Sequence, residues 1–314
     1  MKVTQAPHSI LMVRPANFGF NPLTAASNSF QQQGAEAPDI IRSHARLEFD
    51  LFVEKLVAAG IDVIVLEDTP DPITPDAVFP NNWISFHDDG SVILYPMMAE
   101  NRRLERREEL VLLLEKKYEF SVNRILDLTF YEQYDKFLEG TGSMVLDYVN
   151  RKVYANFSPR TEETVLERFC REMNYSKEIF SFVDENGMEI YHANVVMCIG
   201  TGYVIVCLES IIDEAERINM LNSFEKTGHE IIDISYHQLS NFAGNMIELQ
   251  NSKGDSFLVM SDSAFRSLGK DQEKRLKRHA ELLFSPLNTI EKYGGGSARC
   301  MIAGIFLPKK ASLV

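Results

Sequence analysis

The sequence is poor in cysteine and has no long apolar run. Four cysteines are spread over 314 residues without any CxxC pair or His-rich tract, which excludes a disulfide framework and a metal site; we also expect no cofactor. No apolar stretch nears the roughly 18 residues of a spanning helix. The first residues, MKVTQAPHSILMV, are too short an apolar run for a secretion signal. We therefore expect a soluble, cytoplasmic protein.

Basic residues are also few compared with acidic ones. The chain has 32 Lys and Arg against 45 Asp and Glu, which gives a net charge of −13 and a pI of about 5.1. Nucleic acids and anionic membranes are therefore disfavoured as partners, because both require a basic surface. We expect a small molecule as the partner, and the sequence does not indicate an oligomeric state.

One order of elements recurs along the chain: a loop of small or polar residues, an apolar hairpin and a helical pattern. The predicted hairpins cover residues 81–97, 140–157, 192–208 and 244–260. The predicted helices that follow them cover residues 100–118, 161–173, 210–228 and 271–284. A doubly wound α/β sheet would also alternate strands and helices, but it does not explain this repeated order.

The last repeat, residues 294–308, has one apolar strand and no second one. The segment 8–18 is an apolar strand without a partner of its own, and the predicted helix 45–60 follows it. We expect these two segments to pair, so that five units close into a ring. The sequence thus predicts an α/β fold in which residues 1–314 form a single domain of five loop–hairpin–helix units.

A ring would bring the residues that open successive hairpins to one central site. The residues at these positions are Asp76, Asn81, Asn82, Glu139, His192, Asn194, Asn245 and Cys300. A thiol, an imidazole, carboxylates and amides together are typical of a catalytic site. Taken singly, each has a simpler interpretation: a turn aspartate, a solvated glutamate or a hydrogen-bonded core histidine.

The cysteines differ in their surroundings. Cys170 falls in a helical pattern, and Cys198 and Cys207 fall among apolar residues, so all three are expected to pack in the core. Cys300 follows three glycines and is adjacent to Arg299. This setting predicts a partly exposed thiol that can be activated.

Several motifs in this chain resemble those of the guanidino-modifying enzymes, a group of arginine deiminases, dimethylarginine hydrolases, agmatine deiminases and amidinotransferases. The motifs are FLEG at Glu139, YHAN at His192, GGGSARCM at Cys300, PDAVFPNNW at Asp76 and FSPRT at Arg160. Glu, His and Cys occur in the chain order of that family, and MVRPANF resembles its opening strand. The resemblance covers nearly the whole chain and implies the five-bladed α/β propeller, or pentein, fold with pseudo-fivefold symmetry.

The resemblance also implies a role for each site residue. Cys300 would attack the central carbon of a guanidinium or ureido group, with His192 as general acid and base and Glu139 orienting it. Asp76 would accept hydrogen bonds from the substrate nitrogens. Arg160 would bind a substrate carboxylate.

The chain departs from the arginine deiminases two residues after the histidine, where Asn194 replaces an aspartate. An amide can donate to a ureido oxygen, whereas a guanidinium offers only donors and favours carboxylates. Together with Asn82 in PNNW, this favours a citrulline hydrolase. The alternatives are an arginine deiminase or amidinotransferase and, without chemistry, a ribosome anti-association factor of the same fold, which would not need Glu139, His192 and Cys300.

Overall fold

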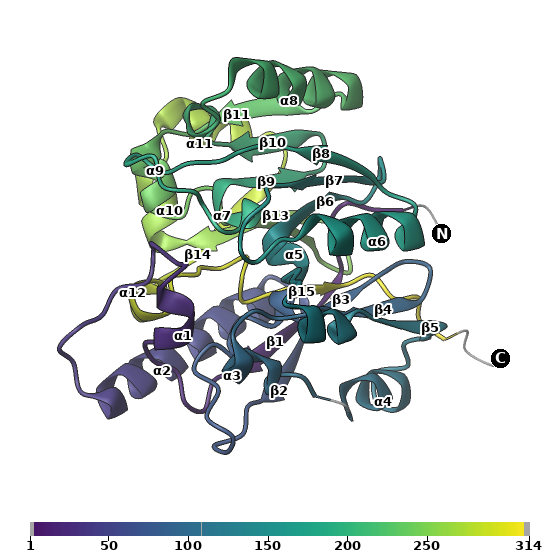
Figure 1. Ribbon diagram of the computed structural model, residues 1–314, viewed down its shortest axis with the longest axis vertical. Helices are drawn as coiled ribbons and strands as arrows, with labels where there is room; N and C mark the ends of the chain where they lie inside the picture. The colour runs from purple at the N-terminus through teal and green to yellow at the C-terminus, as the bar shows by residue number, and fades with distance from the viewer. Residues whose placement is uncertain (1–2, 108, 311–314) are drawn as a thin grey trace.

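The computed structural model describes residues 3–107 and 109–310 (Figure 1). Its strands fall into sets of three, each consisting of an antiparallel pair and a third strand parallel to the middle one. The first four sets are β3 (Ile84–Phe86), β4 (Ser91–Leu94) and β5 (Arg124–Asp127); β6 (Met144–Asp147), β7 (Lys152–Ala155) and β8 (Ser176–Ile179); β9 (Met197–Gly200), β10 (Tyr203–Val206) and β11 (Glu230–Asp233); β12 (Ile247–Gln250), β13 (Ser256–Ser261) and β14 (Glu281–Ser285).

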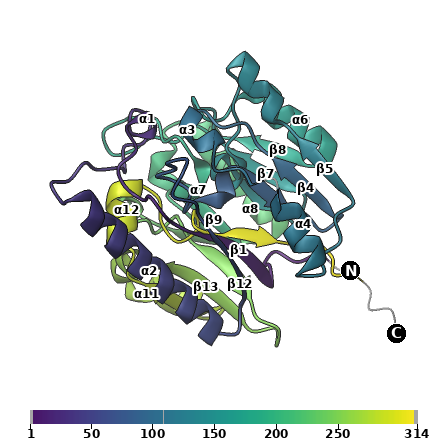
Figure 2. The ribbon, with the colours of Figure 1, turned by 90° about the horizontal axis from the view of Figure 1, so that it is seen from below.

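The fifth set joins strands from distant parts of the sequence: β15 (Ala303–Ile305), β1 (Ser9–Arg14) and β2 (Asp62–Glu67). Ser9 pairs with Ile305 in the antiparallel half and with Asp62 in the parallel half. Figures 1 and 2 both show β1 and β15 side by side. The expected pairing of segments 8–18 and 294–308 is therefore confirmed. A bridge between Ile305 and Phe86 joins this set to β3, which makes one six-stranded sheet.

A helical segment connects the middle strand of each set to the third strand, because parallel neighbours need a crossover. Figure 2 shows α2, α4 and α6 on the outside of the strands. The crossover helices are α1 (Pro22–Ala25), α2 (Pro38–Ala58), α3 (Glu100–Arg103), α4 (Glu109–Lys116), α6 (Glu163–Met173), α8 (Glu214–Thr227), α10 (Asp262–Ser267) and α11 (Lys270–Leu276). The crossovers are amphipathic: α6, for example, buries Val165, Leu166, Phe169, Cys170 and Met173.

The remaining helices are short and lie where the chain enters the first strand of a set. They are α5 (Gly140–Ser143), α7 (Ala193–Val196), α9 (Tyr236–Ser240) and α12 (Asn288–Gly294), with the 3-10 turns η1 (Pro80–Asn82) and η2 (Thr129–Tyr134). A further 3-10 turn, η3 (Leu208–Ser210), belongs to the crossover from β10 to β11. η1, α5 and α7 directly precede β3, β6 and β9. Within the described part of the chain, no helix is long and apolar enough to cross a membrane.

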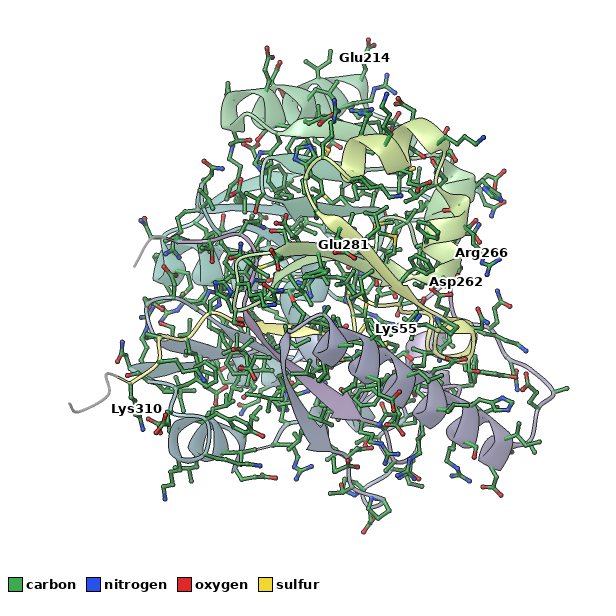
Figure 3. All side chains as sticks on the ribbon, turned by 180° about the vertical axis from the view of Figure 1, so that it is seen from behind. Lys55, Glu214, Asp262, Arg266, Glu281 and Lys310 are labelled. Atoms are coloured by element: carbon green, nitrogen blue, oxygen red, sulfur yellow. The ribbon has the colours of Figure 1, made fainter. Side chains whose placement is uncertain are left out.

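Two of the predicted helices are wrong in part. The pattern over residues 100–118 forms two short helices, α3 and α4, because Arg102 and Glu105 turn inward and are almost completely buried. The pattern over residues 271–284 is a helix only as far as Leu276, and its second half forms the edge strand β14. Figure 3 shows Lys55 of α2 beside β14, where its Nζ donates to the carbonyl of Phe284 at 2.7 Å.

Candidate active site

Cys300 lies in a turn between α12 and β15. Gly295 ends α12 with φ +61°, a left-handed conformation that favours glycine, and the chain then turns back into the sheet. A Cβ on Gly296 would lie 3.3 Å from the Cβ of Cys300 and 3.0 Å from the Phe79 ring. The glycines therefore allow a close approach, and Cys300 is only 5% exposed. The expectation of a partly exposed thiol is wrong.

Two amide groups point at the sulfur of Cys300. Nδ2 of Asn245 lies 3.2 Å from Sγ and Nδ2 of Asn194 lies 3.5 Å from it. Asn245 is held in turn by donating to the carbonyl of Asn194 at 2.8 Å and accepting from the Cys300 N–H at 3.4 Å. N–H donors around a buried sulfur stabilise negative charge on it. This arrangement suits a nucleophilic thiolate.

His192 and Glu139 lie together at the starts of neighbouring sets. Glu139 precedes α5, His192 precedes α7, and Nε2 of His192 is 3.0 Å from Oε2 of Glu139. Although these two atoms are close, Nε2 of His192 has no hydrogen-bond partner among the described residues. The other carboxylate oxygen of Glu139 accepts from the Met98 N–H at 3.1 Å. Glu139 is thus anchored and can orient the imidazole.

The charges of this pair follow from burial and from Arg160. Burial would raise the pKa of Glu139, but the nearby Arg160 guanidinium and His192 outweigh it and hold that pKa below its usual range. Burial lowers the pKa of His192 well below its usual value, although Glu139 opposes this effect. At neutral pH the site therefore holds an ionised Glu139 and a neutral His192 that can accept a proton.

Gly142 makes this arrangement possible. A Cβ at Gly142 would lie 2.7 Å from Nδ1 of His192 and would collide with Nδ2 of Asn82. The glycine in FLEGTG thus lets the α5 turn pack directly against the imidazole.

Asp76 and Asn82 reach the same site from the segment around η1. Oδ2 of Asp76 accepts from Asn21 at 2.8 Å and from Thr24 at 3.1 Å, while its buried Oδ1 has no hydrogen-bond partner among the described residues. Asn82 donates to the carbonyl of Glu139 at 3.4 Å. The neighbouring Asn81 is fully buried, and neither of its side-chain polar atoms has a partner among the described residues.

Arg102 and Glu105 are among the site residues that the sequence analysis missed. Arg102 donates to Glu105 through Nε at 2.8 Å and Nη2 at 2.9 Å, and its Nη1 donates to Oδ1 of Asn82 at 2.8 Å. Burial raises the pKa of Glu105, but this bidentate contact favours its ionised form. Both residues lie in the charged stretch RRLER, which resembles a solvated helix surface in sequence. An inward arginine cannot be distinguished there without the fold.

Arg160 is placed differently from the expectation. Its guanidinium lies 4.5 Å from the Tyr191 ring and donates to Ser27 through Nε at 2.9 Å, to the Thr24 carbonyl through Nη2 at 2.8 Å and to Glu139 through Nη1 at 3.4 Å. Because an arginine has five N–H groups, little of the fork remains free to bind a carboxylate in this conformation.

The site encloses a small cavity, which we call the Cys300 cavity. Its volume is about 20 Å³, which is enough for one or two water molecules. Its walls include Thr24, Asn28, Asp76, Phe79, Asn82, Arg102, Arg160, Tyr191, His192, Gly294, Gly295, Gly296 and Cys300. Of the expected site residues, Glu139 and Asn194 are not on this wall: Glu139 contacts His192, and Asn194 contacts the sulfur of Cys300. Among the described residues, no group of three or more His, Cys, Asp or Glu could hold a metal ion.

Solved structures with the same fold include an arginine dihydrolase. ArgZ, an arginine dihydrolase from the ornithine–ammonia cycle in cyanobacteria, matches with a TM-score of 0.73 and 16% identity, over 97% of this chain and 42% of ArgZ. Unliganded AgrE matches with a TM-score of 0.73 and 18% identity, over 97% of this chain and 40% of AgrE. The chain therefore spans about two fifths of these two proteins.

A shorter relative matches along its whole length. DDAH from Pseudomonas aeruginosa, a cysteine-to-serine mutant complexed with citrulline, matches with a TM-score of 0.65 and 14% identity, over 95% of this chain and 99% of that chain. At these identities the likeness shows the α/β fold of the pentein enzymes. A comparison with curated protein sequences gave no match.

The sequence itself matches a family. The match is to the family described as N,N dimethylarginine dimethylhydrolase, eukaryotic, and it extends over residues 14–307. This range contains every site residue described above. The chain thus belongs to the dimethylarginine dimethylhydrolase family of hydrolases, within the pentein superfamily of guanidino-modifying enzymes.

Proposed function

We propose that this protein hydrolyses a carbon–nitrogen bond of a linear ureido or guanidino amino acid through a covalent intermediate on Cys300, with citrulline as its substrate. The observation that carries this proposal is the cavity in which Cys300, His192 and the unpartnered Oδ1 of Asp76 meet. Two amide donors at the sulfur add a means of stabilising the thiolate.

In the first step, the thiolate of Cys300 attacks the central carbon, and a carbon–sulfur bond forms. His192, neutral at first, takes the thiol proton and passes it to the departing nitrogen, which leaves as an amine. Glu139 stabilises the imidazolium that forms in between. Asn194, 3.5 Å from Sγ, is placed to donate to the oxygen on the attacked carbon as well as to the sulfur.

In the second step, His192 accepts a proton from water while the water oxygen attacks the same carbon. The carbon–sulfur bond breaks, the thiolate is restored, and the acyl fragment leaves. For citrulline, the fragment that leaves is a carbamic acid, which breaks its remaining carbon–nitrogen bond by losing carbon dioxide, so that citrulline and one water yield ornithine, ammonia and carbon dioxide.

The free donors and acceptors of the cavity favour a ureido group. Asp76 Oδ1 is an unused acceptor, while Asn82 Nδ2, Arg102 Nη1 and Arg160 Nη1 each keep one N–H beyond those already bonded. A ureido group has both N–H donors and a carbonyl acceptor, so it can satisfy both kinds of site. A guanidinium has donors only and would leave the cavity donors facing its positive charge.

The second candidate substrate is arginine or an N-methylated arginine. The family description favours it, and Asp76 Oδ1 would accept from a guanidinium as readily as from a ureido nitrogen. Deiminase or amidinotransferase chemistry would use the same three groups. A ribosome-binding role without chemistry has no use for a buried Cys300–His192–Glu139 set.

We also propose that the five sets of strands are the five blades of an α/β propeller and that residues 1–314 form one domain. In support, each set has the same strand order, and a second cavity is lined by β15, β3, β6, β9 and β12, the first strand of every set. A single calorimetric unfolding transition would support one domain, and two separate transitions would contradict it. The cytoplasmic location stays a prediction.

The test of the function is product analysis after incubation with citrulline, arginine or N,N-dimethylarginine in separate reactions. The Cys300→Ser variant is the matched control for each substrate. Ornithine from citrulline supports the first proposal, and citrulline from either arginine supports the second candidate. If the wild type and the variant give the same products in the same amounts, the protein is not a Cys300-dependent hydrolase.

A further inference from the structure

A second cavity lies on the other side of the turn that carries Cys300, and we call it the Arg299 cavity. The ends of β3, β6, β9, β12 and β15 line it, together with Arg299 and Tyr148. Its volume is about 40 Å³. None of its lining residues belongs to the wall of the Cys300 cavity.

Arg299 is the unusual member of this wall. Its guanidinium makes a hydrogen bond from Nη1 to the carbonyl of Ile302 at 2.9 Å, which uses one of five N–H groups. Within residues 3–107 and 109–310, no carboxylate forms an ion pair with it. Burial lowers the pKa of Arg299, as it does for any cation taken out of water without a counter-charge. An unpaired charge in such a place is costly unless a ligand neutralises it.

Glu248, the carboxylate on the same wall, already has a hydrogen-bond partner. Glu248 accepts from the Thr201 N–H and does not pair with Arg299. Tyr148, whose ring is tilted against that of Phe306 with the centroids 4.0 Å apart, lines the same cavity as Arg299 and has a hydroxyl group. The cavity wall therefore has a guanidinium that forms no ion pair with any described residue and a phenol donor, while its one carboxylate is bonded to Thr201.

The size of the cavity limits the ligand. Since one water needs about 10–15 Å³ by this measure, the space holds roughly three waters or a planar ion of three or four heavy atoms. A planar oxyanion matches the fork of a guanidinium through two parallel hydrogen bonds. Larger polyhydroxy acids do not fit.

We propose that the Arg299 cavity is a binding site for a small planar oxyanion, a carboxylate or bicarbonate, held between Arg299 and Tyr148. The site does not depend on the reaction at Cys300. Arg299 immediately precedes Cys300 in the chain, so the bound anion would lie one residue from the thiol.

The test is isothermal titration calorimetry of the whole protein with sodium formate, at an ionic strength kept constant with sodium gluconate, which is too large for the cavity. Saturable formate binding by the wild type is expected. Arg299→Gln should weaken it at least about tenfold, because a charge-assisted hydrogen bond is lost. Arg171→Gln, a change at an exposed arginine of α6, is the matched control and should leave binding unchanged.

Two further variants keep the test decisive if Arg299→Gln does not fold. Glu248→Gln removes the one negative charge of the wall and should tighten formate binding, and Tyr148→Phe should weaken it. Arg160→Gln tests whether formate binds in the Cys300 cavity instead. A loss of binding in Arg160→Gln with none in Arg299→Gln would overturn the proposal. Absence of saturable binding in the wild type would overturn it as well, and the cavity would then hold water only.

Discussion

The Cys300 cavity and the Arg299 cavity each have one cysteine in their walls, and the two thiols have different surroundings. Cys198 lies within β9, and it shares the wall of the Arg299 cavity with Arg299 and Glu248. Burial raises the pKa of the Cys198 thiol to about 12. Cys300 lies in a turn outside the strands, where side chains from two other sets reach its sulfur.

The difference shows how this fold separates packing from chemistry. A strand residue has its backbone fixed by the ladder and its side chain fixed by the pleat, so its thiol packs like a small apolar group. In the turns before the strands, the direction of a side chain is not fixed by a sheet, so side chains from different sets can meet there. Substitutions of the two cysteines and of the buried residues around the two cavities test this difference.

The largest effect is expected from Cys300→Ser, which should lower turnover by roughly a thousandfold or more, because a serine hydroxyl is a weak nucleophile at neutral pH. Cys198→Ser makes the same chemical change in the Arg299 cavity and should keep turnover within about twofold. Steady-state rates on citrulline and arginine check both variants. Equal losses in the two would abolish the distinction between the thiols.

The next effect concerns two buried histidines. His192→Asn should lower kcat by about 10²–10⁴-fold, because the proton carrier is lost. His87 has its Nε2 2.8 Å from the Ser85 hydroxyl, in a network that continues to Tyr95, so His87→Asn should leave kcat nearly unchanged. The measurement is kcat for both, together with the melting temperature to show that each variant is folded. A large loss of kcat in folded His87→Asn would contradict this assignment.

A smaller effect is expected from Asn245→Asp. The carboxylate is the same shape as the amide but cannot donate to Sγ, so we expect alkylation by iodoacetamide to slow by about 10–100-fold. Asn222→Asp makes the same charge change at an exposed site on α8 and should have little effect. The alkylation rate of Cys300, followed by mass spectrometry of its peptide, gives the answer. An unchanged rate in Asn245→Asp would show that the amide does not act on the sulfur.

The smallest effect is on stability. Burial lowers the pKa of His87 to about 4, whereas an unfolded histidine titrates near about 6.5. Between these values the unfolded chain binds more protons, so the free energy of unfolding falls as the pH falls. His87→Gln should reduce this fall by on the order of 1–3 kcal/mol. Urea unfolding at about pH 7.5 and about pH 5 gives the free energy of unfolding at each pH. If the difference between the two pH values is the same in the variant as in the wild type, His87 does not contribute to it.

The hairpins could be predicted from the sequence, and the third strand of each set could not. The hairpins are buried apolar pairs around turns such as Asp89–Gly90, and both signals are local. The third strands β5 and β8 are mostly exposed or half-buried edges, so their residues show no clear alternation. Their pairing depends on neighbours that the chain supplies far away.

The site could be predicted as a set of residues but not as a set of contacts. Cys300, His192, Glu139 and Asp76 follow from their positions before successive strands, and the fold does bring them to one place. That Asn194 points at the sulfur, that the Arg160 fork is occupied and that Arg102 turns inward depend on side-chain packing between sets. No single segment carries that information.

The pairing of β1 with β15 also has a consequence for how the chain is made. Ser9 leaves the ribosome long before its antiparallel partner Ile305, which is synthesised only after Cys300. At about 5–20 residues per second, the first strand waits tens of seconds for that partner. During this time one edge of β1, with apolar residues such as Leu11, is open to other chains. Folding during translation therefore has to protect this edge until the segment that contains Cys300 and β15 has been made.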